Sequence, residues 1–486
     1  MANVMHLFRL GRLFAIGICA ALLCATMWSQ TPAKLIVRNA YIFTMDSTHH
    51  EPFHGYLVVA VDGTLSAVAA GDPPSTLKAA AIYDAHGHWI IPGFISAHSH
   101  LWQAAFRGLA ADSTLTGWLT AVYNDSGNKS RPEDLYWFTL SGALDHLQHG
   151  ITSVYSFDYG GDSVCSPAPA DIAQTCNGYT FRAEMDSGIR FVHGYDVGKA
   201  TPPGVTPAYT AAQARIPLNA FLNYAQQTST KANTQQYLST MISGYAAFSN
   251  TENQAYLDKA LMQEFHLHNQ SHYLEPPEAA KEEQAKFHWF TDSGLLGPDL
   301  IFGHFIHTTP EILAATGKAG VAMTWNPLSN GRLASGVPDI PAYLKAGIRV
   351  GMGVDGEASA DLADPFENMR TGLYAIRDKY ESATIMSPYD VLRLHTLGSA
   401  DVLNLANKLG SLEPGKLADF LIIDPIRFGP VSDPYASLVF IASEPDLESV
   451  YIGGTLRVDH GHLINQNITK VYTEVNERVA RIRNAK

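Results

Sequence analysis

The feature that most constrains this chain is an alternation of short apolar runs and helical patterns between about residues 91 and 405. Eight runs have the pattern of strands: Phe94–Ala97, Ser153–Phe157, Arg190–Tyr195, Thr240–Tyr245, Gln270–Leu274, Leu300–His304, Val321–Trp325 and Arg349–Val354. Helical patterns lie between them, including Asp134–His149, Gln254–Phe265, Pro277–Thr291 and Pro310–Lys318. Eight βα units in one domain predict an α/β fold, a (β/α)₈ barrel of the TIM type.

The fourth strand is the weakest of the eight. It follows a long polar stretch, residues 197–240, that is rich in Thr, Gln, Pro and Ala. We expect this stretch to be an insertion with irregular helix.

At both ends of the chain the sequence pattern differs from that of residues 91–405. Strand patterns separated by turns occur at residues 34–45, 56–61 and 64–68, and again at Phe420–Asp424, Leu438–Ala442, Glu448–Ile452 and Thr455–Val458. We therefore expect a small composite β-sandwich domain, built from residues 31–90 and 406–486, beside a barrel of residues 91–405.

The first 30 residues resemble a secretory signal peptide. Arg9 and Arg12 precede an apolar run of 16 residues, Leu13–Trp28. That run is short of the roughly 20 residues that a membrane span needs. Met27 and Trp28 stand where a cleavage site has small residues, so an uncleaved anchor is the alternative. We expect export to the periplasm or the extracellular space, and no later segment is apolar enough to span a membrane.

Composition and charge exclude several classes of protein. Hydrophobic residues make up 46% and charged residues 16%, which excludes a disordered chain. The net charge of −13 becomes −15 without residues 1–30, which hold two arginines and no acid. An acidic surface repels phosphate backbones, so we expect a small-molecule substrate and no nucleic-acid partner. The sequence is compatible with a homo-oligomer.

Two cysteines, Cys165 and Cys176, remain after the expected signal peptide. In an oxidising compartment two nearby cysteines predict a disulfide, and two free thiols are the alternative.

Histidines supply the first candidate metal ligands. The chain has four His-x-His pairs: His86/His88, His98/His100, His266/His268 and His460/His462. Only His98 and His100 end a barrel strand, where residues i and i+2 point to one side and catalytic residues concentrate. We expect the first and last pairs to lie in solvated turns. Asp355 follows the eighth strand, and a carboxylate beside imidazoles suits zinc or iron(II).

Four more candidates lie at or just after the ends of the fifth and sixth strands. In the fifth, His272 points toward the barrel mouth and Glu275 follows it by three residues. His268 is the competing ligand, although we expect it to end the preceding helix. His304 ends the sixth strand, and His307 follows in the loop as a candidate substrate-binding residue.

In combination, several motifs resemble the amidohydrolase superfamily, in the branch of atrazine-type hydrolases, S-adenosylhomocysteine-type deaminases and cytosine deaminases. The resemblance covers residues 34–465. The motifs begin with Ile91-Pro-Gly-Phe-Ile-Ser-Ala-His-Ser-His-Leu-Trp-Gln103, Arg107-Gly108 and His272-Tyr-Leu-Glu275. They continue with His304, Asn326-Pro-Leu-Ser-Asn330, Gly351–Gly356, Asp364–Arg370 and Gly410–Asp419.

The resemblance implies a metal held by four residues: His98, His100, His272 and Asp355. It also implies proton-transfer and substrate-polarising roles for Glu275, His304 and Asp355. Two-metal members of the family use a lysine at the end of the fourth strand. No such lysine is evident here, so we expect one divalent metal, with Zn²⁺ favoured over Fe²⁺. Trp102 and Gln103, just past the histidine pair, are candidates to stack on and hydrogen-bond a flat heterocycle, with simple packing as the alternative.

The expected activity is hydrolysis of a carbon–nitrogen bond that is not a peptide bond. Deamination of an aminated N-heterocycle by a metal-bound hydroxide is the favoured reaction. A cyclic-amide ring hydrolase and a chlorohydrolase of a triazine-like ring are the enzymatic alternatives. A barrel that binds a ligand without turnover would need a lost ligand or a lost Glu275, and neither is seen. A transporter's binding protein would have a two-lobed sheet fold.

Overall fold

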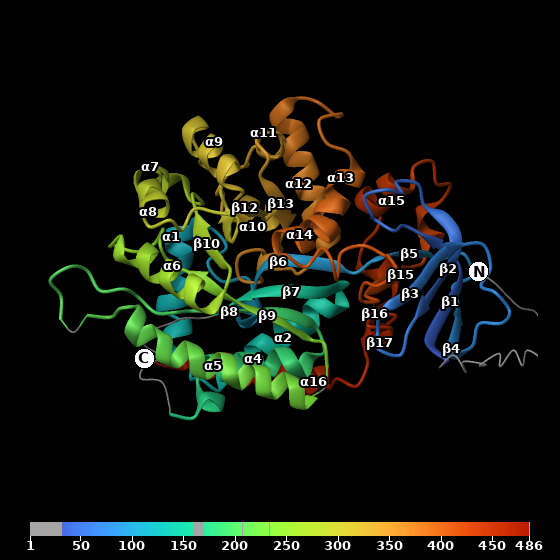
Figure 1. Cartoon of the computed structure of the whole chain (residues 1–486), viewed down its shortest axis with the longest axis horizontal. Coiled ribbons are helices and arrows are strands. Elements are labelled where there is room, and N and C mark those ends of the chain that lie inside the picture. The colour runs from blue at the N-terminus through green and yellow to red at the C-terminus, as the bar shows by residue number, and fades with distance from the viewer. Residues whose placement is uncertain (1–31, 159–164, 166–169, 207, 233, 486) are drawn as a thin grey trace, which may run out of the picture.

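The computed structural model describes residues 32–485 except 159–164, 166–169, 207 and 233. The predicted signal peptide, residues 1–30, lies outside the described residues. A large barrel of strands and helices and a smaller β domain lie side by side (Figure 1). Among the described residues, no helix has the length and apolar character of a membrane span.

The barrel is a parallel sheet in the order β13-β12-β11-β10-β9-β8-β7-β6-β14. Its strands are β6 (Phe94–His100), β7 (Ile151–Phe157), β8 (Arg190–Tyr195), β9 (Tyr237–Gly244), β10 (Asn269–Tyr273), β11 (Leu300–His304), β12 (Ala322–Trp325), β13 (Arg349–Met352) and β14 (Asp355–Gly356). β14 follows β13 directly in the chain and pairs with β6, in the register Asp355↔Ser99. The sheet therefore closes on itself, which confirms the predicted (β/α)₈ barrel.

Side chains from alternate positions of the strands fill the barrel interior. Ala97, Tyr155, Val192, Met241 and Ile301 belong to one buried apolar cluster. The outward positions of the same strands pack against the helices, so each strand is buried on both faces. This explains why the strands have continuous apolar runs in the sequence.

Helices cover the outside of the barrel. The longer ones are α2 (Asp134–Gln148), α4 (Cys176–Ser187), α5 (Ala211–Ala232), α6 (Asn253–Phe265), α9 (Pro310–Ala319) and α12 (Pro365–Tyr380). The shorter ones include α1 (Leu115–Leu119), α7 (Ala280–Ala285), α8 (Phe287–Asp292), α10 (Pro327–Arg332), α11 (Ile340–Lys345), α13 (Pro388–Arg393) and α14 (Ser399–Val402). The expected irregular insertion at 197–240 is only partly irregular. Half of that stretch is the regular helix α5, whose Leu218 and Phe221 are fully or almost fully buried.

The β domain combines both ends of the chain. Its strands are β1 (Ala33–Ile42), β2 (Phe53–Val59), β3 (Leu65–Ala70), β4 (Ala79–Asp84), β5 (Trp89–Pro92), β15 (Phe420–Ile423), β16 (Leu447–Ile452), β17 (Thr455–Asp459) and β18 (His462–Leu463). They belong to one hydrogen-bonded sheet in which β5, from the N-terminal part, pairs with β15. The strand expected at Leu438–Ala442 is wrong, because Asp433 caps a helix there, α15 (Pro434–Phe440).

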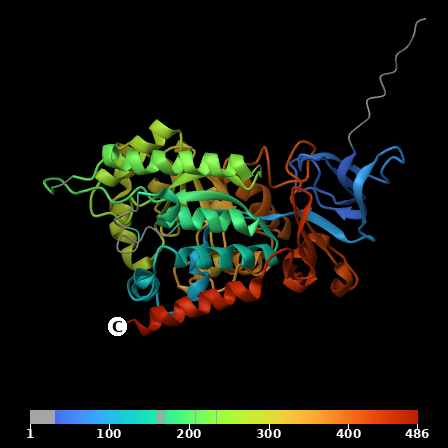
Figure 2. The same ribbon diagram turned by 90° about the horizontal axis from the view of Figure 1, so that it is seen from below.

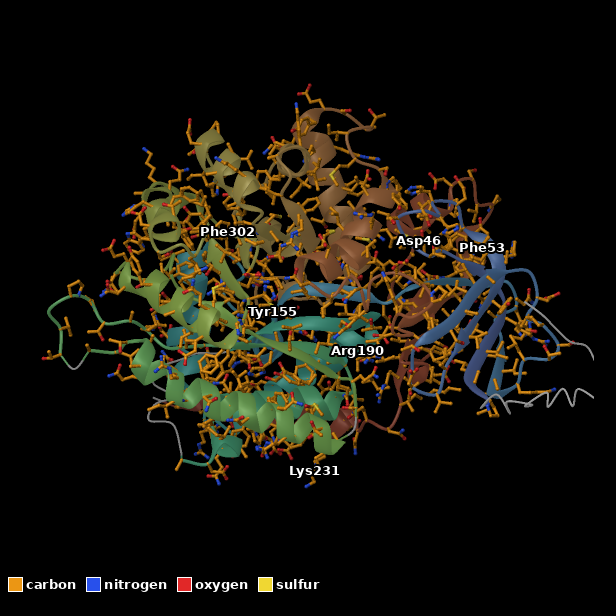
Figure 3. All side chains as sticks on the ribbon, in the orientation of Figure 1. Asp46, Phe53, Tyr155, Arg190, Lys231 and Phe302 are labelled. Carbon is orange, nitrogen blue, oxygen red and sulfur yellow. A yellow bond between two sulfur atoms is a disulfide. The ribbon has the colours of Figure 1, made fainter. Side chains whose placement is uncertain are left out.

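A buried ion pair joins the two domains. Arg190, the first residue of β8, donates two hydrogen bonds to the carboxylate of Asp419, at 2.6 and 2.9 Å. Gly453 N donates to the same carboxylate at 2.7 Å. Figure 3 labels Arg190 near the junction of the two domains. Since Arg190 begins its strand, the β domain meets the amino-terminal end of the barrel and leaves the carboxyl-terminal end open.

The chain ends in a helix that the sequence analysis did not predict, α16 (Ile468–Asn484). It runs along the barrel beneath α2 (Figure 2). Val471, Val475, Val479 and Ile482 recur at helical spacing and are buried. The buried carboxylate of Asp134 in α2 pairs with arginines of α16.

The predicted disulfide is confirmed. Cys165 and Cys176 are bonded, with their Cα atoms 5.6 Å apart. Cys176 is the first residue of α4, so the bond ties the connection after β7 to that helix.

Candidate active site

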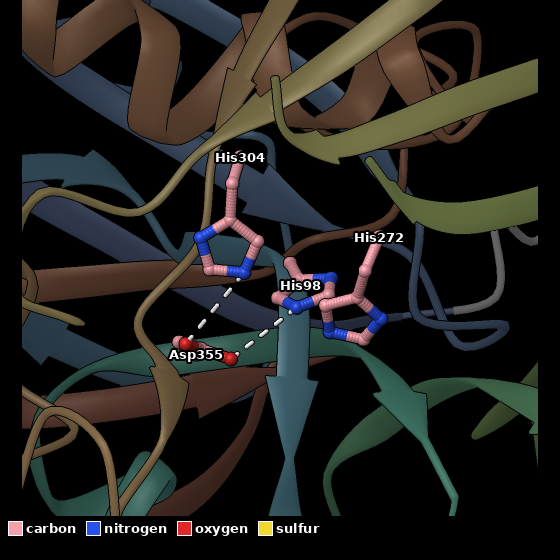
Figure 4. A group of neighbouring side chains, drawn as sticks. All are labelled: His98, His272, His304 and Asp355. Carbon is pink, nitrogen blue, oxygen red and sulfur yellow. Dashed lines mark ion pairs between the residues drawn. The ribbon is translucent and has the colours of Figure 1, made fainter. Parts of the chain in front are cut away.

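Five polar side chains converge at the carboxyl ends of four barrel strands, the adjacent pair β6 and β14 and the adjacent pair β10 and β11. They are His98 and His100 of β6, His272 of β10, His304 of β11 and Asp355 of β14. Figure 4 shows four of them pointing toward one another. The Nε2 atoms of His98 and His100 each lie 3.3 Å from Asp355 Oδ1. His100 Nε2 also lies 3.2 Å from His272 Nε2.

The other ring nitrogens fix which atoms face the centre. His100 Nδ1 donates to the carbonyl of Phe157 at 2.9 Å. His98 Nδ1 donates to Oε1 of Gln270, whose amide in turn donates to Ala97 O at 2.9 Å. A neutral imidazole that donates through Nδ1 has only a lone pair on Nε2. His98 Nε2 is buried and has no hydrogen-bond partner among the described residues.

Asp355 is the negative member of this group. Burial alone would raise the pKa of its carboxyl, but the imidazoles of His100, His98 and His304, when in their protonated, hydrogen-bond-donating forms, hold that pKa well below its usual range. Ser359 Oγ donates to its Oδ2 at 3.0 Å. Asp355 is thus an oriented carboxylate anion at the centre of the histidines.

The two remaining histidines are held in their neutral forms. Burial, with the neighbouring imidazoles, lowers the pKa of His272 well below its usual range. Burial lowers the pKa of His304 to about 3, against the attraction of Asp355. The amides of Asn330 and Asn326 contact His304 Nδ1 and Nε2, at 2.8 and 3.3 Å, and fix the plane of its ring.

Glu275 lies beside the histidines, three residues beyond His272. Its Oε1 is 3.6 Å from His304 Nδ1, and Ser335 Oγ donates to the same oxygen at 3.4 Å. Burial, reinforced by the charge of Asp355, raises the pKa of Glu275 well above its usual range. A carboxyl whose pKa is raised by burial releases its proton less readily than an exposed one and is suited to acid–base work.

A cavity of about 570 Å³ opens over this group. Its base includes His100, His272, His304, Glu275 and Asp355. Its walls are largely aromatic and come from Trp118, Tyr123, Phe157, Tyr245 and Phe248. Its polar part includes Asn124, Asn128, Asp158, Asp196 and Lys199. A pocket with flat apolar walls and few polar groups is typical of a site for a small organic molecule.

Three predicted substrate-binding residues do not line this cavity. The turn Leu101–Phe106 directs Trp102 into the core, where its ring contacts Tyr123. Gln103 is also buried, and it donates to the hydroxyl of Tyr123 at 3.3 Å. For both residues the structure supports the packing alternative, with Tyr123 between them and the cavity. His307 Nε2 instead donates to Ser335 O at 2.7 Å, so it supports the segment that carries the hydroxyl partner of Glu275.

His268, the competing ligand, lies at the wrong end of the barrel. It precedes β10, whereas His272 is near the carboxyl end of that strand. His268 Nδ1 is 3.1 Å from Asp299 Oδ1, and its ring contacts Asn404. The structure therefore brings His272 and not His268 to the other histidines.

Sequence reasoning missed Gln270 and Ser335, and it assigned no role to Asn326 and Asn330. Gln270 precedes His272 by two residues, so strand periodicity places both on the inward face. This spacing could have identified Gln270 from the sequence. No sequence pattern indicated Ser335, because it reaches Glu275 only through the folded loop after α10.

A second buried group of histidine and carboxylates lies in the barrel wall. It consists of Asp158, Glu184 and His193. Here His193 Nδ1 is 2.8 Å from Glu184 Oε2, and Nε2 is 3.1 Å from Asp158 Oδ2. Thr180 and Ser156 donate to Asp158 at 2.6 and 3.1 Å. Both ring nitrogens of His193 already have partners, so this group is a hydrogen-bonded chain within the protein.

A closed barrel with imidazoles, a carboxylate and a buried glutamate at its carboxyl-terminal face defines the class of metal-dependent barrel hydrolases. A family model described as "Amidohydrolase family" matches residues 89–457. The chain belongs to this family. The protein is accordingly a hydrolase that acts on carbon–nitrogen bonds other than peptide bonds.

One curated relative and two solved structures illustrate what the chain is similar to. A 5-methylthioadenosine/S-adenosylhomocysteine deaminase of Desulforudis audaxviator is 28% identical over 433 residues, which is 87% of this chain and 92% of that protein. The fold resembles an adenosine deaminase of Xanthomonas campestris with bound zinc, with a TM-score of 0.78, 20% identity and coverage of 93% and 99% of the two chains. It also resembles an atrazine chlorohydrolase of Arthrobacter aurescens in complex with zinc and atraton, with a TM-score of 0.77, 20% identity and coverage of 92% and 100%.

Proposed function

We propose that the protein hydrolytically deaminates an aminated N-heterocycle, with one divalent metal, Zn²⁺ in preference to Fe²⁺, held by His98, His100, His272 and Asp355. The observation that carries this proposal is the orientation of the donor atoms. The Nε2 lone pairs of His98 and His100 both face the anionic oxygen Asp355 Oδ1, at 3.3 Å. Two hydrogen-bond acceptors that face each other in a buried space repel each other unless a cation lies between them. Three neutral imidazoles and one carboxylate are the donor set that zinc or iron(II) prefers.

When bound, the metal supplies Lewis acidity that lowers the pKa of water toward 7. The protein's own groups then move the protons. Asp355 accepts a proton of the attacking water at its carboxylate, and Glu275 delivers a proton to the ring nitrogen next to the carbon under attack. The proton held by Asp355 then passes to the amino group, which leaves as ammonia, and the remaining hydroxyl proton of the adduct returns to Glu275 as the carbonyl forms. His304, which stays neutral, donates a hydrogen bond to the oxygen that develops on that carbon.

The cavity also indicates the size and charge of the substrate. Its volume of about 570 Å³ lies in the range of sites for drug-sized ligands and leaves room beside a bare heterocycle. Of the described residues that line it, Lys199 has a cationic side chain, whereas Asp158 and Asp196 are acidic. This balance disfavours a phosphorylated substrate. We therefore propose a heterocycle with an uncharged polar substituent, such as a nucleoside, in keeping with the deaminase names of the relatives.

We also propose that the mature protein begins after about residue 30 and works outside the cytosol. The basic and then apolar start supports this proposal. The disulfide between Cys165 and Cys176 suits an oxidising compartment. N-terminal sequencing of the protein from its native host tests the proposal, and a cytosolic protein that begins at Met1 or Ala2 would contradict it.

A screen for ammonia release tests the reaction itself. Purified protein loaded with Zn²⁺ or Fe²⁺ is incubated with adenosine, 5′-deoxyadenosine, guanine, cytosine, an aminotriazine and a cyclic amide. We expect ammonia from an aminopurine nucleoside, at a higher kcat/KM than from the free base. Ring opening of the cyclic amide without ammonia release from any amine would contradict deamination.

A further inference from the structure

The segment that carries Glu275 has an unusual backbone. Leu274, one residue before it, has φ +56°, in the left-handed region that leucine rarely adopts. Pro276 and Pro277 follow directly and offer no backbone N–H. Proline also restricts the residue before it, here Glu275, to extended conformations. A turn of this kind persists only where its surroundings hold it.

The carbonyl of the strained residue is tied to the next strand. Leu274 O accepts hydrogen bonds from Ile306 N at 2.9 Å and from His307 N at 3.0 Å. Both donors follow β11, the strand that ends in His304. The amides of Leu274 and Glu275 have no such partner in the sheet, because β10 ends at Tyr273.

One buried carboxylate accepts hydrogen bonds from both of these amides. Glu283 lies in α7, eight residues beyond Glu275, and is 3% exposed. Its Oε2 accepts a hydrogen bond from Leu274 N, and its carboxylate also interacts with the amide of Glu275. Its backbone carbonyl accepts from the hydroxyl of Tyr273 at 3.0 Å. Glu283 therefore binds the three consecutive residues that end in Glu275.

We propose that Glu283 is a positioning residue, whose carboxylate fixes the Leu274–Glu275 turn and thereby holds the Glu275 carboxyl over the metal centre. This inference rests on the proposed function in one respect, namely that Glu275 is the proton-transfer group. Without this acceptor, Leu274 would relax toward an ordinary conformation. Glu275 would then leave the position in which Ser335 and His304 contact it. The loss falls on the chemical step and not on substrate binding, because Glu283 does not line the cavity.

A matched pair of substitutions separates the hydrogen bonds from simple packing. Glu283→Gln keeps the size and one amide-accepting oxygen, whereas Glu283→Leu keeps the approximate size and removes every acceptor. We expect Glu283→Leu to lose about 10- to 100-fold in kcat, as for outer residues that orient active-site groups, with KM and metal content unchanged. Glu283→Gln should regain most of that loss. Glu282→Gln is the control, since its side chain is 72% exposed and pairs with Lys286.

Amide hydrogen exchange gives a readout that needs no substrate. In the wild-type protein, the amides of Leu274 and Glu275 should exchange slowly, and Glu283→Leu should expose both while Glu282→Gln leaves them protected. Rapid exchange of these two amides in the wild-type protein would overturn the proposal, even if Glu283→Leu fails to fold. Equal kcat values for Glu283→Leu and Glu283→Gln would also overturn it. If the wild-type protein releases ammonia from no compound, the proposed function fails while the exchange measurement still decides the backbone role.

Discussion

Two buried groups in this barrel combine histidine with carboxylate, and they differ in where their lone pairs point. In the group at the strand ends, His98 and His100 use Nδ1 for hydrogen bonds within the protein and direct Nε2 at Asp355. In the wall group, His193 uses both ring nitrogens for Glu184 and Asp158. Burial and residue type are alike in the two groups. What distinguishes the two groups is the second ring nitrogen of each histidine. In the strand-end group this nitrogen points at a carboxylate and needs a cation, whereas in the wall group it already has a partner within the protein.

The same contrast applies to the buried glutamates. Burial raises the pKa of Glu275 and of Glu184 well above the usual range. Glu275 lines a cavity that can hold substrate, whereas Glu184, which contacts His193, is not among the residues that line it. A raised pKa is therefore a sign of function only where a substrate can reach the group.

The largest expected effect separates these two glutamates. Glu275→Gln keeps the shape of the side chain but cannot cycle a proton, so we expect a loss of about 10²–10⁴-fold in kcat with metal retained. Glu184→Gln is the matched control, and we expect it to keep kcat at temperatures where it is folded. Steady-state kinetics beside metal analysis and thermal unfolding check both variants. A metal-loaded and fully active Glu275→Gln would show that proton transfer belongs to His304 or Asp355.

The next effect concerns stability. His193→Ala leaves Asp158 and Glu184 buried without the imidazole between them, which we expect to cost about 3–5 kcal/mol of unfolding free energy. The metal content of the folded protein should not change. Denaturant unfolding measures the cost. A stable His193→Ala that has lost its metal would erase the distinction between the two groups.

A smaller effect is the pH dependence of the unfolding free energy that comes from a buried histidine whose hydrogen-bond partners are neutral. His395 donates through Nδ1 to Ile95 O at 3.2 Å and accepts from Asn368 at 3.1 Å. Burial lowers its pKa to about 4. The unfolded chain, with a histidine pKa near 6.5, binds this proton first as the pH falls. Stability from this group is therefore complete above about pH 6.5 and is lost between pH 6.5 and 4, by about 2 kcal/mol at pH 5.

The variant His395→Gln isolates this contribution. It removes the titration, so its deficit in unfolding free energy relative to the wild type should shrink by about 2 kcal/mol between pH 7 and pH 5. Denaturant unfolding at both values measures the change. A deficit that stays constant or grows would show that His395 is protonated in the folded protein.

The barrel and its strand-end residues could be predicted because they depend on local patterns. Most barrel strands are buried on both faces and are therefore short apolar runs, and the site histidines lie at or near strand ends. The polar strand β10, Asn269-Gln-Ser-His-Tyr273, is the exception. The helix α5 was missed because its 22 residues include Pro217 and many polar side chains, which mask a narrow buried stripe. The expected strand at Leu438–Ala442 failed because a short apolar run suits a strand and a buried helix equally.

The contacts that hold the site depend on the folded chain and were less accessible. Trp102 and Gln103 follow the histidine pair in sequence, but a tight turn directs them into the core. Glu283 reaches Glu275 from helix α7, which follows β10, and Ser335 reaches it from the loop after α10, so no local sequence spacing could predict either contact. Gln270 is the exception, since it shares the inward face of β10 with His272.

The central claim is that the strand-end group holds one metal and the wall group holds none. The most direct test is the metal content of four purified proteins: the wild type, His272→Ala, His268→Ala and His193→Ala. The account predicts one equivalent of divalent metal per chain in the wild type, in His268→Ala and in His193→Ala, and almost none in His272→Ala. One equivalent retained by His272→Ala, or a metal lost from His193→Ala, would contradict it.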